Sequence, residues 1–285
     1  DILRIWVASS NYAEDLRIDY SILDQHAESY RKIRNTFRYL LGNINDNFEK
    51  INLDKLDIEK LPELEQLMLH RIYILNNNFK KYFNNYDFHN LYKELLNFCT
   101  VDLSAFYFDI RKDNLYCDLK DSAKRKSTIV LLNIILNALL KWFAPILSFT
   151  TEEIYKLLLN NNRSIHLEKF KKYPPKFNNI KLNQKWMELI KIRNICNVSI
   201  EEKRSLKEIG SSLEAELKIE INKKYKDMLQ NIDLSELCIT SKAEINYSDN
   251  QEAIVVTNKA KGSKCSICWK VKEFACERSS CPIKS

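Results

Sequence analysis

The sequence predicts a mainly α protein, in which an antiparallel helix bundle is followed by a small α+β appendage and a C-terminal zinc knuckle. Apolar residues recur at spacings of three and four through most of the first 160 residues, as in amphipathic helices. Alternation typical of strands appears only beyond residue 210. Half of the eight cysteines lie in the last 21 residues.

The first part of the chain predicts five helices, of which the fifth is short. Long amphipathic helices joined by short links are the pattern of an antiparallel bundle. Asp87 and Ser122 are expected to cap the third and fourth helices, and Pro145 interrupts the fourth. The most apolar stretch, Ile129–Leu140, is too short to span a bilayer and predicts a buried central helix. The predicted helical segments are 19–44, 64–86, 88–106, 122–143 and 150–159.

The pattern changes after Tyr173-Pro174-Pro175, which we interpret as a domain boundary. A helix is expected over 182–200. Strands are expected over 213–221 and 253–257, because apolar and polar residues alternate in the first and β-branched residues dominate the second.

The terminal cysteines predict a structural zinc site. Cys265-Ser-Ile-Cys268 can place two thiolates on one tight turn, and Cys276 and Cys281 can complete a tetrahedral set. One alternative is a redox Cys-x-x-Cys, but that motif normally opens a helix in a βαβ unit, for which the sequence gives no sign. Four thiolates also leave no open position for a catalytic zinc.

The charge and the other cysteines restrict the function class. The net charge is +7, and residues 259–285 carry seven Lys and Arg against two Glu. Such a basic tail favours a nucleic-acid partner, the alternative being a surface that only maintains solubility.

Cys99, Cys117, Cys196 and Cys238 lie singly in apolar or mixed segments and are expected to be buried thiols in a reducing compartment.

Two basic groups in the bundle are candidate RNA contacts. Arg31, Arg34 and Arg38 follow one stripe of a helix, where guanidinium groups can bind phosphates; the alternative is a solvated face with local ion pairs. Lys124 and Arg125 lie in the first turn of a helix, where the dipole disfavours cations. A bound anion can offset that cost, as can ordinary solvation.

No catalytic centre is predicted. Three glycines are too few for a Walker loop or a dinucleotide fingerprint, because both need several glycines around a phosphate. His26, His70, His89 and His166 have no metal-like or triad-like spacing, and no Ser/His/Asp set or carboxylate pair stands out.

Several segments together resemble class I isoleucyl-tRNA synthetases of the bacterial type. Asp1–Tyr12 is similar to the segment that follows their KMSKS loop, and Tyr30–Leu41 to the opening of their anticodon-binding bundle. Cys265-x-x-Cys268-Trp269 resembles their zinc knuckle. The middle of the bundle and the appendage are matched by 86–89, 106–113, 121–126, 144–150 and 210–215.

The resemblance implies four parts: residues 1–18 as the tail of a catalytic domain, 19–175 as the anticodon-binding bundle, 176–258 as the α+β subdomain and 259–285 as the zinc knuckle. Two departures stand out. Cys276 and Cys281 are separated by four residues, whereas the family has a second close pair. The HIGH and KMSKS motifs and the editing domain do not occur in this sequence, so we expect this portion to be inactive by itself and the sequence to be a fragment.

By this resemblance, the parent enzyme would join isoleucine to tRNA(Ile) using ATP, which this portion does not bind. The chain would contact the tRNA and the missing catalytic and editing domains, as a cytoplasmic monomer without a membrane partner. Lys261, Lys264 and Trp269 are candidates near the anticodon, the tryptophan either by stacking on a base or by packing in the knuckle. The alternatives are a stand-alone RNA-binding module and a zinc-dependent protein scaffold without catalysis.

Overall fold

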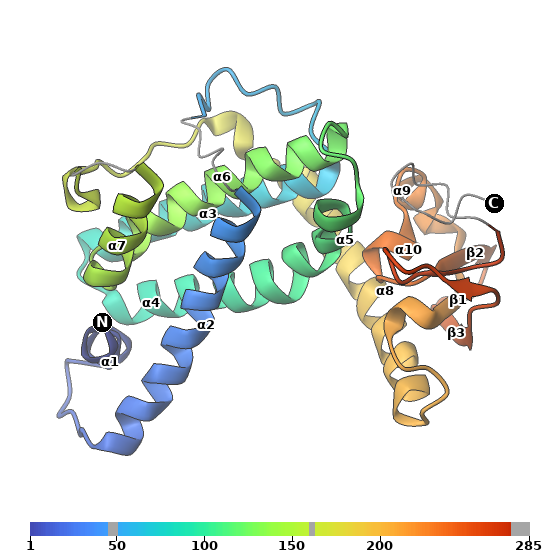
Figure 1. Cartoon of the computed structure of the whole chain (residues 1–285), viewed down its shortest axis with the longest axis horizontal. Helices are drawn as coiled ribbons and strands as arrows, with labels where there is room; N and C mark the ends of the chain where they lie inside the picture. Colours follow the sequence, from blue (N-terminus) through green and yellow to red (C-terminus); the bar gives the residue numbers. More distant parts are fainter. Residues whose placement is uncertain (45–50, 160–162, 275–285) are drawn as a thin grey trace. The chain divides into compact units, whose positions relative to one another are not determined.

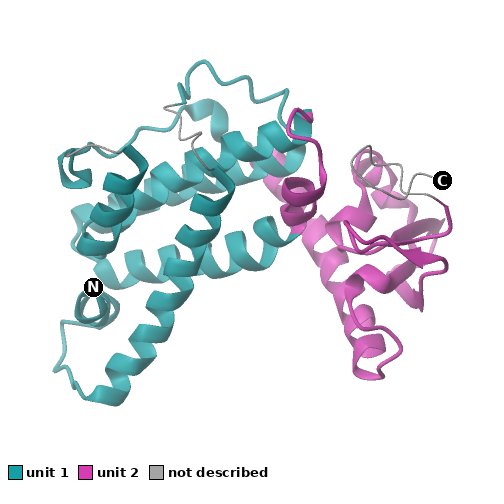
Figure 2. Ribbon diagram, viewed as in Figure 1, with its two compact units in different colours: residues 1–109, 123–179 teal, residues 110–122, 180–285 magenta. Residues whose placement is uncertain are grey.

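The structure is a computed structural model that describes residues 1–44, 51–159 and 163–274. Helices predominate, and the described residues add one three-stranded sheet and one two-stranded hairpin (Figure 1). The predicted mainly α class is therefore confirmed. The chain forms two compact units (Figure 2), the first made of residues 1–109 and 123–179, the second of residues 110–122 and the chain from 180 onward.

The first unit is helical. Its elements are α1 (Ile2–Ser9), α2 (Tyr20–Ile44), α3 (Glu63–Asn84), α4 (Phe88–Asn97), η1 (Phe98–Phe108), α6 (Ala123–Phe143), α7 (Ser148–Leu159) and the short 3₁₀ turns η2 (Ile165–Leu167) and η3 (Pro175–Phe177). Both α2 and α3 pack against α6. The Phe37 and Phe143 rings meet edge to face at 6.1 Å, and the Trp142 indole donates to Asn76 over 3.3 Å. The core of this unit is therefore centred on α6.

Helix α6 contains the predicted central segment Ile129–Leu140, and most of that segment is buried. Within the described ranges α6 is the one helix whose length and composition would suffice to cross a membrane, and 72% of its most apolar window is buried inside the structure. That burial is typical of a core helix.

The predicted third helix is longer and less regular than its periodicity indicates. Asp87 caps α4 as expected, accepting from the Asn90 amide at 3.2 Å. After α4 the chain continues through the π-helical stretch η1 into α5 (Asp109–Cys117). Residues five apart fall on one face when hydrogen bonds run from i to i+5, and Phe98, Leu103 and Phe108 have that spacing and are all buried. A search for apolar residues three or four positions apart does not find this spacing of five.

Helix α1, which we did not predict as a helix, is tied to the connection between α6 and α7. Arg4 donates to the Pro145 and Ile146 carbonyls at 2.6 and 2.9 Å. The Asp1 carboxylate accepts from the Thr150 amide at 2.9 Å and from its hydroxyl at 2.6 Å. The start of the chain is thus part of the first unit.

The second unit combines helices with a sheet. Besides residues 110–117 of α5, it contains α8 (Ile180–Ser205), η4 (Ser212–Glu214), β1 (Ala215–Asn222), η5 (Lys223–Tyr225), α9 (Lys226–Leu229), α10 (Leu234–Leu237), β2 (Lys242–Ser248), β3 (Ile254–Lys259), β4 (Ser263–Lys264) and β5 (Val271–Lys272). The sheet order is β2-β1-β3, with β1 parallel to β2 and antiparallel to β3. Helix α8 packs against β3, where Ser199 and Thr257 share a 2.7 Å hydrogen bond.

The predicted strands correspond to β1 and β3, with ends shifted by one or two residues. Strand β1 is central, and its alternate residues Ala215, Leu217, Ile219 and Ile221 are fully buried. Strand β2 was not predicted. It lies at an edge, carries polar residues at alternate positions and has no fully buried side chain, so its pattern is weak.

Candidate nucleic-acid and metal-binding surfaces

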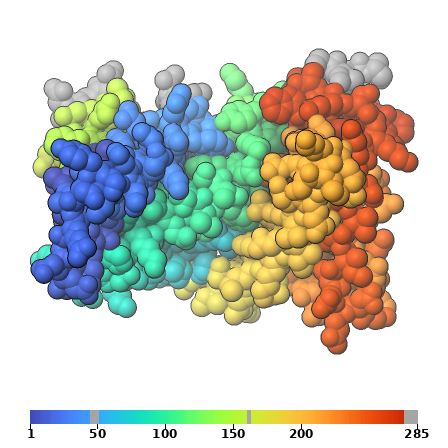
Figure 3. All heavy atoms as spheres, turned by 90° about the horizontal axis from the view of Figure 1, so that it is seen from below, coloured from blue at the N-terminus to red at the C-terminus, as the bar shows by residue number. Residues whose placement is uncertain are grey.

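The three arginines predicted to contact phosphate lie on one stripe of α2 in the first unit. Arg31, Arg34 and Arg38 are all exposed, at the i, i+3 and i+7 positions that share a helix face. Figure 3 shows the α2 segment, in blue, forming part of one surface of the molecule. The stripe is therefore accessible to a ligand.

The members of this stripe differ in their local partners. Arg31 forms an ion pair with Glu28 one turn earlier, as the solvated-face alternative expects. Among the residues that the structure describes, Arg34 reaches only the Tyr30 hydroxyl, at a long 3.4 Å, and that hydroxyl also bonds the Thr150 hydroxyl at 2.8 Å. Arg34 and Arg38 are consequently better candidates for an external anion than Arg31.

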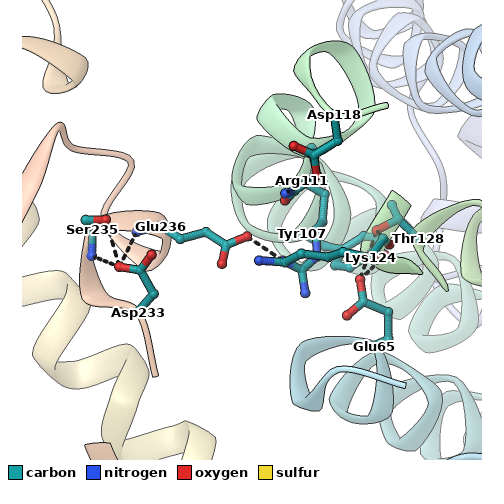
Figure 4. Close-up of polar contacts among 10 residues, drawn as sticks. Glu65, Tyr107, Arg111, Asp118, Lys124, Thr128, Asp233, Ser235 and Glu236 are labelled. Carbon is teal, nitrogen blue, oxygen red and sulfur yellow. Dashed lines mark hydrogen bonds and ion pairs between the residues drawn. The ribbon is translucent and has the colours of Figure 1, made fainter. Parts of the chain in front are cut away.

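Lys124 and Arg125 lie in the first turn of α6, as predicted, and both are half-buried. One turn later, the Thr128 hydroxyl bonds Glu65, whose side chain is fully buried. Tyr107 donates to the same carboxylate at 3.0 Å (Figure 4). A buried carboxylate at this end of α6 favours a structural role for the first-turn cations. Lys124 and Arg125 are therefore weaker RNA candidates than the α2 stripe.

In the second unit, Cys265 and Cys268 lie on the turn that joins β4 to β5. Both thiols are buried, at 2% and 5% exposure. The Cys265 amide donates to the Lys270 carbonyl at 2.9 Å, and the Trp269 amide donates to the Cys265 carbonyl at 3.0 Å. Trp269 adopts a left-handed conformation with φ of 60°, which closes the turn directly after the second cysteine. The Cys-x-x-Cys segment therefore forms a tight, hydrogen-bonded turn.

This turn is anchored to the sheet. The Val271 amide donates to the Ser241 hydroxyl oxygen at 2.6 Å. The Ser241 amide in turn donates to the Ala215 carbonyl at 3.0 Å, at the start of the central strand. The position of the two cysteines is thus set by the framework of the second unit.

A third cysteine, which the sequence did not associate with the turn, packs against it. Cys117, the last residue of α5, is 7% exposed and forms one buried cluster with Cys265 and Cys268. Its thiol donates to the Ile267 carbonyl at 3.7 Å, across 150 residues of sequence. Proximity over such a separation leaves no local sequence signal. All four cysteines outside the tail are buried, as expected.

The remaining metal candidates, Cys276 and Cys281, lie outside the described residues. Across the ranges that the structure does describe, no three His, Cys, Asp or Glu side chains are arranged as a ready-made metal site.

The other predicted RNA contacts also belong to this hairpin region. Lys261 is exposed, whereas Lys264 pairs with Glu214 at 3.3 Å. Trp269 is 61% exposed, so the alternative that it packs inside the knuckle is not favoured. Lys261, Lys264 and Trp269 are thus three exposed residues of the hairpin region in the second unit, whereas the α2 stripe belongs to the first unit.

The first unit also has a cavity that the sequence did not predict. It has a volume of about 520 Å³ and lies between α1, Tyr86, Phe88 and the Pro145-Ile146 segment. Its lining is mainly apolar, which does not suit a phosphate.

Comparison with known proteins identifies close relatives. Residues 65–221 match the family described as the anticodon-binding domain of tRNA ligase. The isoleucine–tRNA ligase of Pelagibacter ubique is 68% identical over 280 residues, which is 98% of this chain and 31% of that protein. The isoleucine–tRNA ligases of Zymomonas mobilis and Bartonella henselae are 38% and 37% identical over 94% and 95% of the chain. The chain spans less than a third of the length of these curated relatives.

Proposed function

Since this chain belongs to the anticodon-binding domain family of tRNA ligases, we propose that it is the tRNA-binding portion of an isoleucine–tRNA ligase. The expected resemblance to the C-terminal portion of the bacterial-type enzymes is confirmed. The whole enzyme would charge tRNA(Ile) with isoleucine, using ATP at a catalytic site outside residues 1–285. This portion would hold the tRNA.

The family match carries the proposal, and two exposed groups supply the contacts. On α2, Arg34 and Arg38 present guanidinium groups that can fork onto phosphate oxygens and so fix the RNA without reading its sequence. On the hairpin, the exposed Trp269 ring can stack on an unpaired base, with Lys261 and Lys264 as neighbouring cations.

We also propose a structural zinc ion at the β4–β5 turn. The donor chemistry fits, because Cys265 and Cys268 are two buried thiols on one tight turn, which is the half-site that zinc takes from a knuckle. The sequence supplies Cys276 and Cys281 as further ligands. The metal would contribute folding free energy to a hairpin of only four paired residues and would hold Trp269 and Lys264 in place.

The test is tRNA binding measured across a salt series. The chain should bind tRNA(Ile), and the logarithm of the affinity should fall linearly with the logarithm of the salt concentration. Replacing both Arg34 and Arg38 by Gln should weaken binding and lower the steepness of that line by about two, one for each lost phosphate contact. Arg204→Gln is the matched control, because Arg204 is an exposed arginine on α8 that pairs with Glu201.

A separate pair of variants tests the aromatic contact. Trp269→Ala should cost about 1–3 kcal/mol of binding free energy if the ring stacks on a base, whereas Trp269→Phe keeps an aromatic face and should lose less. Binding without salt dependence, or none at all, would refute the proposal and favour the zinc-dependent protein scaffold. Salt-dependent binding with equal affinity for any RNA would favour the stand-alone RNA-binding module. The monomeric state and cytoplasmic location stay predictions.

A further inference from the structure

We propose that Tyr30 is a positioning residue for tRNA binding, which orients the Arg34 guanidinium toward a phosphate. The inference rests on the tRNA-binding function proposed above and deepens it, because it separates the residue that touches the RNA from the residue that orients it. The observation that carries it is an unbroken chain of hydrogen bonds within the first unit. This chain runs from Asp1, just before α1, through Thr150 and Tyr30 to Arg34 on α2.

The direction of every hydrogen bond in this series is set by its acidic end. An ionised carboxylate can only accept, so the Thr150 hydroxyl donates its single proton to Asp1, at 2.6 Å. The Thr150 oxygen must then accept from the Tyr30 hydroxyl, at 2.8 Å. The Tyr30 oxygen keeps its lone pairs as acceptors, and it accepts from Arg34 Nη1 at 3.4 Å. Each group therefore has the one role that the next group requires.

The far end of the series is anchored in folded structure. Thr150 lies in the first turn of α7 and is 6% exposed. The Asp1 carboxylate also accepts from the backbone amides of Phe149 and Thr150, at 3.3 and 2.9 Å. These are donors that the start of a helix leaves without intrahelical partners. The Tyr30 hydroxyl is thus bound to α7 (Figure 1), so the acceptor that it offers to Arg34 has a fixed place.

A hydroxyl suits this task because it is neutral. The ion pair of Arg31 with Glu28 places a carboxylate beside the guanidinium, where it competes with a phosphate. Tyr30 instead meets only Nη1 of Arg34, which leaves the edge formed by Nε and Nη2 for two parallel hydrogen bonds to phosphate oxygens. Binding then immobilises a side chain that is already partly oriented. It therefore costs less conformational entropy than binding by an unanchored arginine.

A double-mutant cycle on the full chain tests the assignment, with tRNA(Ile) as the probe. Tyr30→Phe removes only the hydroxyl and should weaken binding about two- to fivefold, which is the lower half of what one hydrogen bond contributes. With Arg34→Gln already present, Tyr30→Phe should weaken binding no further, because the guanidinium that Tyr30 orients is gone. Tyr39→Phe is the matched control, since Tyr39 is another tyrosine of α2 and its hydroxyl bonds the Phe108 carbonyl.

Thr150→Val should weaken binding in the same way, because it removes the acceptor that fixes the Tyr30 hydroxyl. A loss of affinity that is equally large with and without Arg34→Gln would mean that these side chains only support the fold, and would overturn the proposal. Unchanged binding in Tyr30→Phe would also overturn it. Either result would leave the proposed function intact, whereas a chain that binds no tRNA would overturn both.

The orientation of Arg34 can also be measured in the unmodified chain without RNA. Arg38 is the comparison, because it is an exposed arginine on the same stripe and has no hydrogen bond or ion pair among the described residues. The ¹⁵N relaxation order parameter of the Nε–H group should be higher for Arg34 than for Arg38, and should fall to the Arg38 value in Tyr30→Phe. Equal order parameters in the unmodified chain would overturn the proposal whatever the result of the tRNA titrations.

Discussion

The ion pair between Arg111 and Glu236 should contribute substantially to the stability of the second unit. Arg111 is 4% exposed and Glu236 20%, and the charged groups are 2.7 Å apart. Exposed pairs contribute about 0.2–1 kcal/mol, whereas removing one partner of a fully buried pair costs about 3–5 kcal/mol. The burial of the Arg111–Glu236 pair lies between these two cases, and after Glu236→Gln one side-chain oxygen would still accept from the Arg111 guanidinium. We therefore expect Glu236→Gln to cost about 2 kcal/mol.

Hydrogen exchange of the β1 amides is the suitable assay, because β1 is the central strand and its amides report on opening of the second unit alone. A loss of about 2 kcal/mol should speed their exchange by about 30-fold. Glu201→Gln is the control, because Glu201 pairs with Arg204 on the same unit with both side chains more than half exposed. Equal exchange in the two variants would refute the reasoning.

Three further outcomes follow from individual side chains. Tyr107→Phe removes one hydroxyl donor from the fully buried Glu65 and should cost about 1–3 kcal/mol in urea denaturation, with little change if water replaces the hydroxyl. Burial raises the pKa of Asp233, but hydrogen bonds from the first turn of α10 lower it more, so the net pKa lies below 3.8. The ionised Asp233 carboxylate should therefore contribute fully to the free energy of unfolding above pH 3.8, and this contribution should be lost as the pH falls through the pKa of the folded state. Asp233→Asn should flatten that part of the curve of unfolding free energy against pH. Gly262 has a φ of 113°, and a Cβ there would lie 2.1 Å from the Lys272 carbonyl oxygen. Gly262→Ala should therefore distort the hairpin and release zinc at a lower chelator concentration. Unchanged zinc retention would show that the hairpin is dispensable for the site.

The sequence predicted the helices and strands that bury their side chains at a regular spacing. Helix α2 and strand β1 bury every third or fourth and every second residue respectively, so their patterns are clear. Where the spacing or the burial departs from these periods, the sequence missed a feature: residues 88–106 were predicted as a helix but not the π-helical form of η1, and strand β2 was not predicted at all. The π-helical stretch η1 buries residues five apart, and the edge strand β2 buries none of its residues fully.

The candidate sites also differ in whether their residues could be grouped from the sequence. The α2 stripe and the Cys265-x-x-Cys268 turn are local in sequence, so spacing alone indicated that their members lie together. The approach of Cys117 to that turn depends on two anchors in the fold, the ion pair of Arg111 and the hydrogen bond of Ser241. No spacing rule contains that information, because 150 residues separate Cys117 from Ile267.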